Sequence, residues 1–232
     1  NTPDNKIRRY IKLREKWKDR KIWLAAVVLG LVLTLFLTGI NMVRLKRENR
    51  EIQARLDREI QQGIAGEVFR LHVIANSDKD TDQELKLQVK NKIVEYLQQK
   101  LNPDAGLEET KEMVLIHLQE IEEEAEKTVK ESGFDYEVHA AVENTYFPDK
   151  TYGDCTFPAG EYEALNVRIG KAQGHNWWCV LYPSLCFVDD TYGIVTEEKK
   201  EDLKAVLTDE EFDEILKNPQ EKLKVRIGFR WF

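Results

Sequence analysis

Cysteine, proline and glycine are scarce in this chain, and the short motifs that mark common enzymes are missing from it. The 232 residues include only 3 Cys, 6 Pro and 12 Gly, which excludes a collagen-like repeat, a low-complexity linker and a disulfide-dense mini-protein. The four histidines show no metal-ligand spacing such as HExxH, and no GxSxG, P-loop or GxGxxG motif occurs. We therefore expect no catalytic residue, no metal site and no cofactor.

Positive charge is also in short supply once the first 50 residues are set aside. The whole chain has a formal net charge of −7. Residues 1–50 hold 13 Lys and Arg against 4 Asp and Glu, whereas the remaining residues hold 22 against 38. Because phosphate contacts need clustered cations, this acidic body excludes nucleic acid as a partner.

A run without charge extends from Ile22 to Val43 and follows a basic segment, residues 1–21. As a helix, this run would span about 33 Å, enough for a hydrocarbon core of about 30 Å. The positive-inside rule places the basic segment in the cytoplasm and the remainder of the chain outside. No small-x-small cleavage site follows the run, so we expect a transmembrane helix or uncleaved signal anchor over 22–43. A cleaved signal peptide is the alternative.

Residues 44–66 are highly charged and favour a helical stalk that continues the membrane segment. Their spaced apolar positions are Leu45, Ile52, Leu56 and Ile60. A coiled-coil dimer is one alternative, although fewer than three clean heptads are present. We expect Gly63 and Gly66 to end the stalk, and residues 67–232 to form an extracytoplasmic domain.

The domain shows both helical and strand periodicities. Thr81 and Glu84 form a capping box that would open a helix, and Gly133 is expected to cap the end of a second one. Helices are predicted over 81–101, 108–132 and 208–217; strands are predicted over 67–75, 136–143, 162–169, 177–182 and 222–231, with 187–207 extended. This order predicts an α+β fold in which two helices pack on a mostly antiparallel sheet.

Two of the three cysteines, Cys179 and Cys186, are seven residues apart. In an exported domain such a pair favours a disulfide, and two free buried thiols are the alternative. A catalytic cysteine is a sharper alternative, because His175 lies four residues before Cys179. The apolar surroundings of each cysteine disfavour a catalytic role, since they raise the pKa of a thiol. Cys155 is expected to stay unpaired.

Two further local patterns attract attention. Asp78, Asp80 and Asp82 are spaced like a calcium loop, but the glycine and glutamate that such a loop needs at its sixth and twelfth positions are missing. The dipeptide Trp177–Trp178 lies in a predicted strand, so its rings should face opposite sides of the sheet. One ring is expected in the core. The other is either an exposed anchor for a partner or is covered by the domain itself.

Three stretches of the chain resemble one protein family, and they follow one another in the order found in that family. They are Arg70 to Asp78 (RLHVIANSD) with Asp82 and Gln83; Tyr152 and Gly153 followed by Phe157 to Leu165 (FPAGEYEAL); and Asn176 to Phe187 (NWWCVLYPSLCF). Together they resemble the stage II sporulation protein R family of endospore-forming bacteria over residues 67–188. Residues 189–232 carry no motif assignable to that family.

The resemblance implies a signalling protein rather than an enzyme. Such proteins are made in the forespore and exported into the space between the two membranes, where they trigger a membrane-embedded aspartic protease of the mother cell. That protease cleaves the pro-form of a sigma factor. An exported cell-wall or peptide hydrolase and a membrane-anchored spacer are the competing hypotheses. The expected partner-binding residues are Arg70, Asn76, Ser77, Asp78, Trp177 and Trp178.

Overall fold

The structure is a computed structural model that describes residues 3–102, 104–186 and 195–216. The chain divides into two compact units, residues 1–56 and 57–232.

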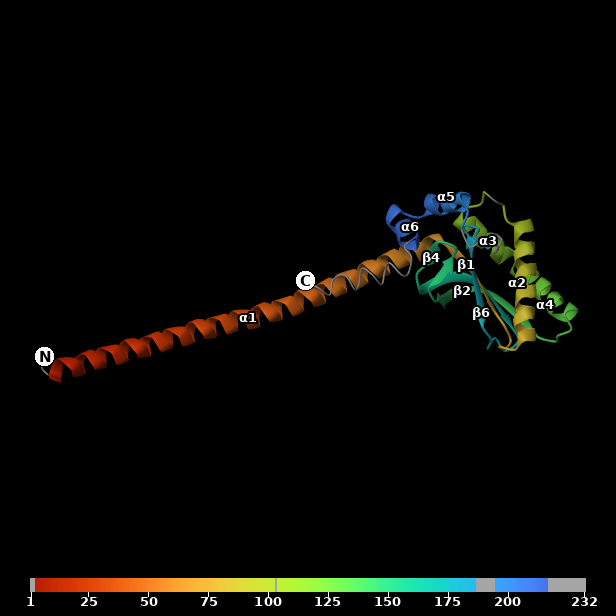
Figure 1. Cartoon of the computed structure of the whole chain (residues 1–232). Helices are drawn as coiled ribbons and strands as arrows, with labels where there is room; N and C mark the ends of the chain where they lie inside the picture. Colours follow the sequence, from red (N-terminus) through yellow and green to blue (C-terminus); the bar gives the residue numbers. More distant parts are fainter. Residues whose placement is uncertain (1–2, 103, 187–194, 217–232) are drawn as a thin grey trace. The chain divides into compact units, whose positions relative to one another are not determined.

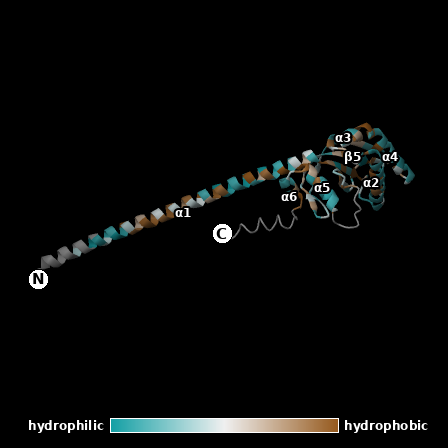
Figure 2. Cartoon of the chain, turned by 90° about the horizontal axis from the view of Figure 1, so that it is seen from above, coloured by the Kyte–Doolittle hydropathy of each residue, from teal (hydrophilic) through white to brown (hydrophobic). Residues whose placement is uncertain are grey.

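Helix α1 (Pro3–Glu67) begins the chain. It contains a stretch long and apolar enough to cross a membrane, seen in Figure 2 as hydrophobic turns between hydrophilic ones. The predicted apolar run and the predicted stalk are both helical. The helix continues through Gly63 and Gly66, and its last turns, from residue 57 onward, belong to the second unit, where Ile64 is fully buried.

The second unit is built on a four-stranded sheet with the order β2-β5-β1-β6. The strands are β1 (Phe69–Ile74), β2 (Val138–Phe147), β5 (Gly160–Ile169) and β6 (Asn176–Tyr182). The central strands β1 and β5 are parallel, whereas β2 pairs with β5 and β6 pairs with β1 in antiparallel fashion. The predicted α+β fold is thus confirmed, with a mixed sheet in which antiparallel pairing predominates.

Two long helices cover one face of this sheet, as Figure 1 shows. They are α2 (Asp80–Lys100) and α4 (Leu118–Glu131). The four-residue spacing of apolar side chains on α2 places its stripe against the sheet; the stripe is Leu85, Val89, Ile93 and Leu97, each at most 1% exposed. A short helix, α3 (Leu107–Ile116), precedes α4.

The opposite face is covered by smaller elements and by the end of α1. These elements are the hairpin of β3 (Lys150–Tyr152) and β4 (Cys155–Phe157), α5 (Glu197–Val206) and α6 (Asp209–Leu216). Their apolar side chains form a second core with Phe147 and Tyr162. The sheet therefore has buried side chains on both faces.

Several local expectations need correction. The predicted helix 108–132 is divided at His117 into α3 and α4, although the apolar spacing runs through that point without a break. The predicted capping box is wrong, because α2 starts after Lys79 and no side chain caps it. Within the predicted extended stretch 187–207, α5 is helical. The predicted strand 222–231 lies outside the described residues.

Candidate functional site

The loop that follows β1 lies beside the loop that joins β5 to β6. The side-chain Oδ1 of Asn76 accepts a hydrogen bond of 3.0 Å from the backbone N of Lys171. Asp78 Oδ1 lies 2.6 Å from both the backbone N and the ring Nδ1 of His175. A Cβ at Gly174 would overlap the carbonyl of Ser77, so a glycine is needed where the two loops touch. The predicted residues 76–78 thus fasten two loops almost a hundred positions apart.

Two of these three polar residues point toward a buried carboxylate. Asp82 is 2% exposed and accepts hydrogen bonds from Ser77 Oγ at 2.5 Å, Asn76 Nδ2 at 2.8 Å and Tyr136 OH at 3.2 Å. Burial by itself would raise the pKa of Asp82, but these donors outweigh it and hold the pKa below its usual value. Asn76 and Ser77, two of the expected partner-binding residues, therefore have a structural role inside the domain.

Asp78 is the member of the run that faces solvent, with 58% of its side chain exposed. The hydrogen bond from the His175 ring and that from the His175 backbone lower the pKa of Asp78. The His175 side chain is 80% exposed. The backbone carbonyl of His175 accepts a 3.1 Å hydrogen bond from the ammonium of Lys86, a buried cation of α2. This corner presents an acid and an imidazole that a partner could reach.

The two tryptophans point to opposite faces of β6, as the strand periodicity predicts. Trp177 packs on the helix-covered core, and the ammonium of Lys90 lies 4.7 Å from its ring centre. Trp178 packs on the other core, stacks on the ring of His72 at 5.7 Å and lies 3.6 Å under the Lys150 ammonium. Both rings are half-buried. The domain itself covers much of each.

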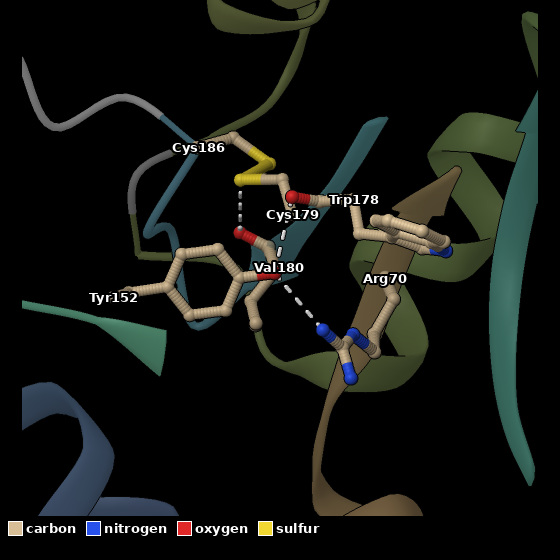
Figure 3. The surroundings of a disulfide bond; sticks show 6 residues. All are labelled: Arg70, Tyr152, Trp178, Cys179, Val180 and Cys186. Atoms are coloured by element: carbon tan, nitrogen blue, oxygen red, sulfur yellow. Dashed lines mark hydrogen bonds between the residues drawn. A yellow bond between two sulfur atoms is a disulfide. The ribbon is translucent and has the colours of Figure 1, made fainter. Parts of the chain in front are cut away.

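Arg70, also expected at the partner surface, is fully buried. Its guanidinium lies 4.0 Å from the ring centre of Phe147 and 4.7 Å from that of Tyr162. Figure 3 shows its Nη2 donating to the hydroxyl of Tyr152 at 2.9 Å, and that hydroxyl in turn donates to the carbonyl of Trp178 at 3.0 Å. Burial lowers the pKa of Arg70. In this position Arg70 supports β6 from inside and does not reach the surface.

The sulfurs of Cys179 and Cys186 are joined in a disulfide, with 5.4 Å between the Cα atoms (Figure 3). The closed loop folds back on β6, because the backbone N of Leu185 and that of Cys186 both donate to the Val180 carbonyl. A sulfur held in a disulfide is not a thiolate, which argues against Cys179 as a nucleophile. Cys155 is free and buried, and burial raises its pKa to about 12.

Sequence reasoning missed a cavity of about 450 Å³ beside the disulfide loop. Its polar lining includes Lys199 of α5, whose ammonium lies 2.9 Å from Ser184 Oγ and 3.0 Å from the Asp202 carboxylate. The cavity lies between the end of α2, the start of α3 and α5. Because these elements are far apart in the sequence, no local pattern indicates the cavity. Across the described ranges, no three His, Cys, Asp or Glu side chains are grouped so as to hold a metal ion.

One exposed aromatic residue, Tyr146, was also missed. It lies near the end of β2 with 60% of its surface exposed. The alternating pattern predicted a strand only to residue 143, whereas β2 continues to Phe147. The further alternation of Asn144, Thr145 and Tyr146 was the available signal.

Comparisons with known proteins give a consistent result. Residues 65–192 match the family described as Stage II sporulation protein R. A protein of that name from Bacillus subtilis (strain 168) is 34% identical over 138 residues, covering 60% of this chain and 62% of the relative. The matched part thus spans less than two thirds of that relative. No solved structure matches. Since the family match covers more than half of the chain and contains the whole four-stranded sheet, the chain belongs to the stage II sporulation protein R family.

Proposed function

We propose that this chain is an exported sporulation signal that binds and activates a membrane-embedded aspartic protease of the mother cell. The protease would then process a pro-sigma factor. The observation that carries the proposal is the family match over β1 to β6 and the disulfide loop. A signalling role in sporulation is what that family membership supports most directly.

Two features favour action outside the cytoplasm. α1 contains a stretch that could cross a membrane or serve as a signal sequence, and the Cys179–Cys186 bond fits an oxidising compartment. The basic residues before the apolar run favour a cytoplasmic N-terminus. We therefore place residues 44–232 in the space between forespore and mother cell, either anchored or released after cleavage.

The orientation can be tested with protease added to intact protoplasts. The C-terminal unit should be digested while an epitope at the N-terminus survives. The reverse pattern of protection would contradict the proposed orientation.

The signalling role itself requires a deletion strain. We expect loss of sigma-factor processing while engulfment of the forespore proceeds normally, and recovery when the full chain is supplied. If engulfment fails as well, the chain acts as a structural spacer. If the purified full chain cleaves peptides or cell wall at a rate that accounts for the phenotype, a hydrolase explains it better.

A further inference from the structure

The outward backbone groups of the two edge strands, β6 and β2, differ in how many of them have hydrogen-bond partners. On the outer edge of β6, the carbonyl of Val180 receives two backbone donors from the disulfide loop, and that of Trp178 receives the Tyr152 hydroxyl. On the outer edge of β2, the backbone N of Ala140 donates to the carboxylate of Glu122 on α4 at 2.7 Å. An edge strand without such partners is a template for another strand. We therefore ask whether the outward backbone groups of β2 after Ala140 have hydrogen-bond partners.

The pairing register of β2 fixes which of its backbone groups point outward. In an antiparallel pair, both backbone groups of alternate residues point away from the neighbouring strand. Ala140, opposite Val167, donates away from β5. Glu161, opposite Tyr146, also has its carbonyl turned away from β2, toward the Gln61 side chain. The same alternation turns the N–H and C=O groups of Val142, Asn144 and Tyr146 outward.

These outward groups are unpaired in the part of the chain that the structure describes. No loop, helix or side chain within the described ranges donates to or accepts from them. Asn144 and Tyr146 are also exposed as side chains. Three donors and three acceptors are thus presented in strand spacing over Val142–Tyr146, which we call the open edge.

The charge around the open edge is negative. Glu143, Glu161 and Glu163 flank it on β2 and β5, and Asp149 follows the strand. Two cations lie among them: Arg168 pairs with Glu143, and Lys111 lies 2.8 Å from Glu163. Glu161 and Asp149 are exposed and form no ion pair within the described residues, so the acids outnumber these two cations. A second copy of this acidic edge would meet like charge, whereas a strand that carries Lys or Arg would meet opposite charge.

We propose that the open edge binds an extended, basic segment of the partner protein, which adds to the sheet as a fifth strand beside β2. Backbone hydrogen bonds would give the affinity, and the acidic flank together with the exposed Tyr146 ring would select the sequence. This inference rests on the proposed signalling function, since it names the surface that the partner uses.

The first test needs no partner. Amide exchange is measured residue by residue on the full chain in detergent micelles. The amides of Val142, Asn144 and Tyr146 should exchange fast, while those of the intervening residues Glu143 and Thr145 are protected by β5. Slow exchange at all five amides would mean that this chain already covers its own edge, with residues outside the described ranges, and would overturn the proposal.

The second test compares two substitutions at one position. Asn144→Pro removes an outward donor without breaking a bond to β5, because proline is tolerated where the N–H faces away from the sheet. Asn144→Ala removes the side chain and keeps the donor. We expect Asn144→Ala to signal normally and Asn144→Pro to lower sigma-factor processing at least about tenfold. Equal processing by both folded variants would refute strand addition.

A charge pair at the same position keeps the proposal testable if Asn144→Pro does not fold. Asn144→Lys should weaken signalling and Asn144→Glu should preserve or strengthen it, since the added strand is basic. The opposite order would contradict the proposed partner chemistry. The deletion strain distinguishes failure of the proposed function from failure of this inference. If deletion leaves sigma-factor processing intact, the proposed signalling function is wrong. If deletion abolishes processing and every Asn144 variant restores it fully, only strand addition at the open edge is wrong.

Discussion

At the scale of single residues, Arg70 is the least expected feature of the domain. Its guanidinium is buried among aromatic rings and the Tyr152 hydroxyl, and its Nε and Nη1 atoms have no hydrogen-bond partner within the described ranges. No described carboxylate pairs with it. A buried charge without a counter-ion is costly, although attraction to ring faces offsets part of that cost.

The first prediction concerns this charge. Arg70→Met keeps much of the side-chain volume and removes the charge, so the free energy of unfolding should stay within about 1 kcal/mol or rise. Arg70→Ala also leaves a cavity and should lose about 2–4 kcal/mol. Urea unfolding of both variants measures the difference. Equal losses in the two variants would show that the guanidinium itself stabilises the fold.

The second prediction concerns Asp82, whose pKa is held below its usual value by hydrogen bonds. A carboxylate with a lowered pKa stabilises the fold above its unfolded pKa of about 4, and that stability is lost as pH falls through the lower folded pKa. Asp82→Asn should therefore destabilise the domain by about 1–3 kcal/mol at pH 7 and flatten the acid side of its stability profile. Asp80→Asn, at an exposed position two residues away, is the matched control. An unchanged acid slope in Asp82→Asn would exclude this role.

At the scale of whole elements, the helices with a clear apolar period were predictable, the eight-residue α6 included, and the three-residue strands were not. The apolar stripe of α2 and the cap at Gly133, whose φ is 83°, could be predicted because each depends on residues close together in the sequence. The strands β3 and β4 have three residues each, too few to show a period. For α5 a signal was present, since Thr196 caps the helix and two glutamates follow in its first turn.

The candidate site shows the same limit. That Asp78 lies at a strand end can be read from the sequence. That Asn76 and Ser77 turn inward cannot, because Asp82 and Tyr136 meet them only after α2 and β2 have packed. The burial of Arg70 likewise depends on rings contributed by β2 and β5. Side chains whose partners are distant in sequence are invisible to periodicity.

The third prediction concerns the disulfide that closes the loop after β6. Its removal frees a loop of seven-residue separation, which costs about 2–3 kcal/mol in the chain-entropy model. The double variant Cys179→Ser with Cys186→Ser should lose that amount by urea unfolding. Adding a reductant to the native protein should reproduce the loss and should leave the double variant unchanged. A reductant effect of the same size on the variant would point to another cause.

At the scale of the whole chain, the second unit starts earlier than composition indicates. Gln61 donates to the Glu161 carbonyl, Ile64 is fully buried, and Gly63 lies directly against Glu211. The last turns of α1 are therefore part of this unit's core, although their charge makes them resemble a stalk. The candidate membrane span and the first turns of the second unit belong to the same helix, α1.

The fourth prediction follows from that boundary. A version exported as residues 57–232 behind a cleavable signal peptide should fold, whereas 67–232 should lose at least the burial of Ile64, about 1.5–3 kcal/mol. If the membrane helix only raises local concentration, 57–232 should restore sigma-factor processing as its dose rises. Thermal unfolding and a dose series measure the two effects. Equal stability of both fragments would place the boundary after α1.

The reaction rate of the buried Cys155 thiol measures how readily the second core opens. Its thiol is fully covered, and burial raises its pKa to about 12, so a thiol reagent or oxidant in the surrounding medium meets it only after the second core separates. We expect one thiol to react in the native protein, at a rate that follows the opening equilibrium and rises with urea. The fraction of molecules modified at this sulfur then reports the fraction in which this core has opened at least once. A rapid reaction in the fully folded protein would show that this core stays permeable to small reagents.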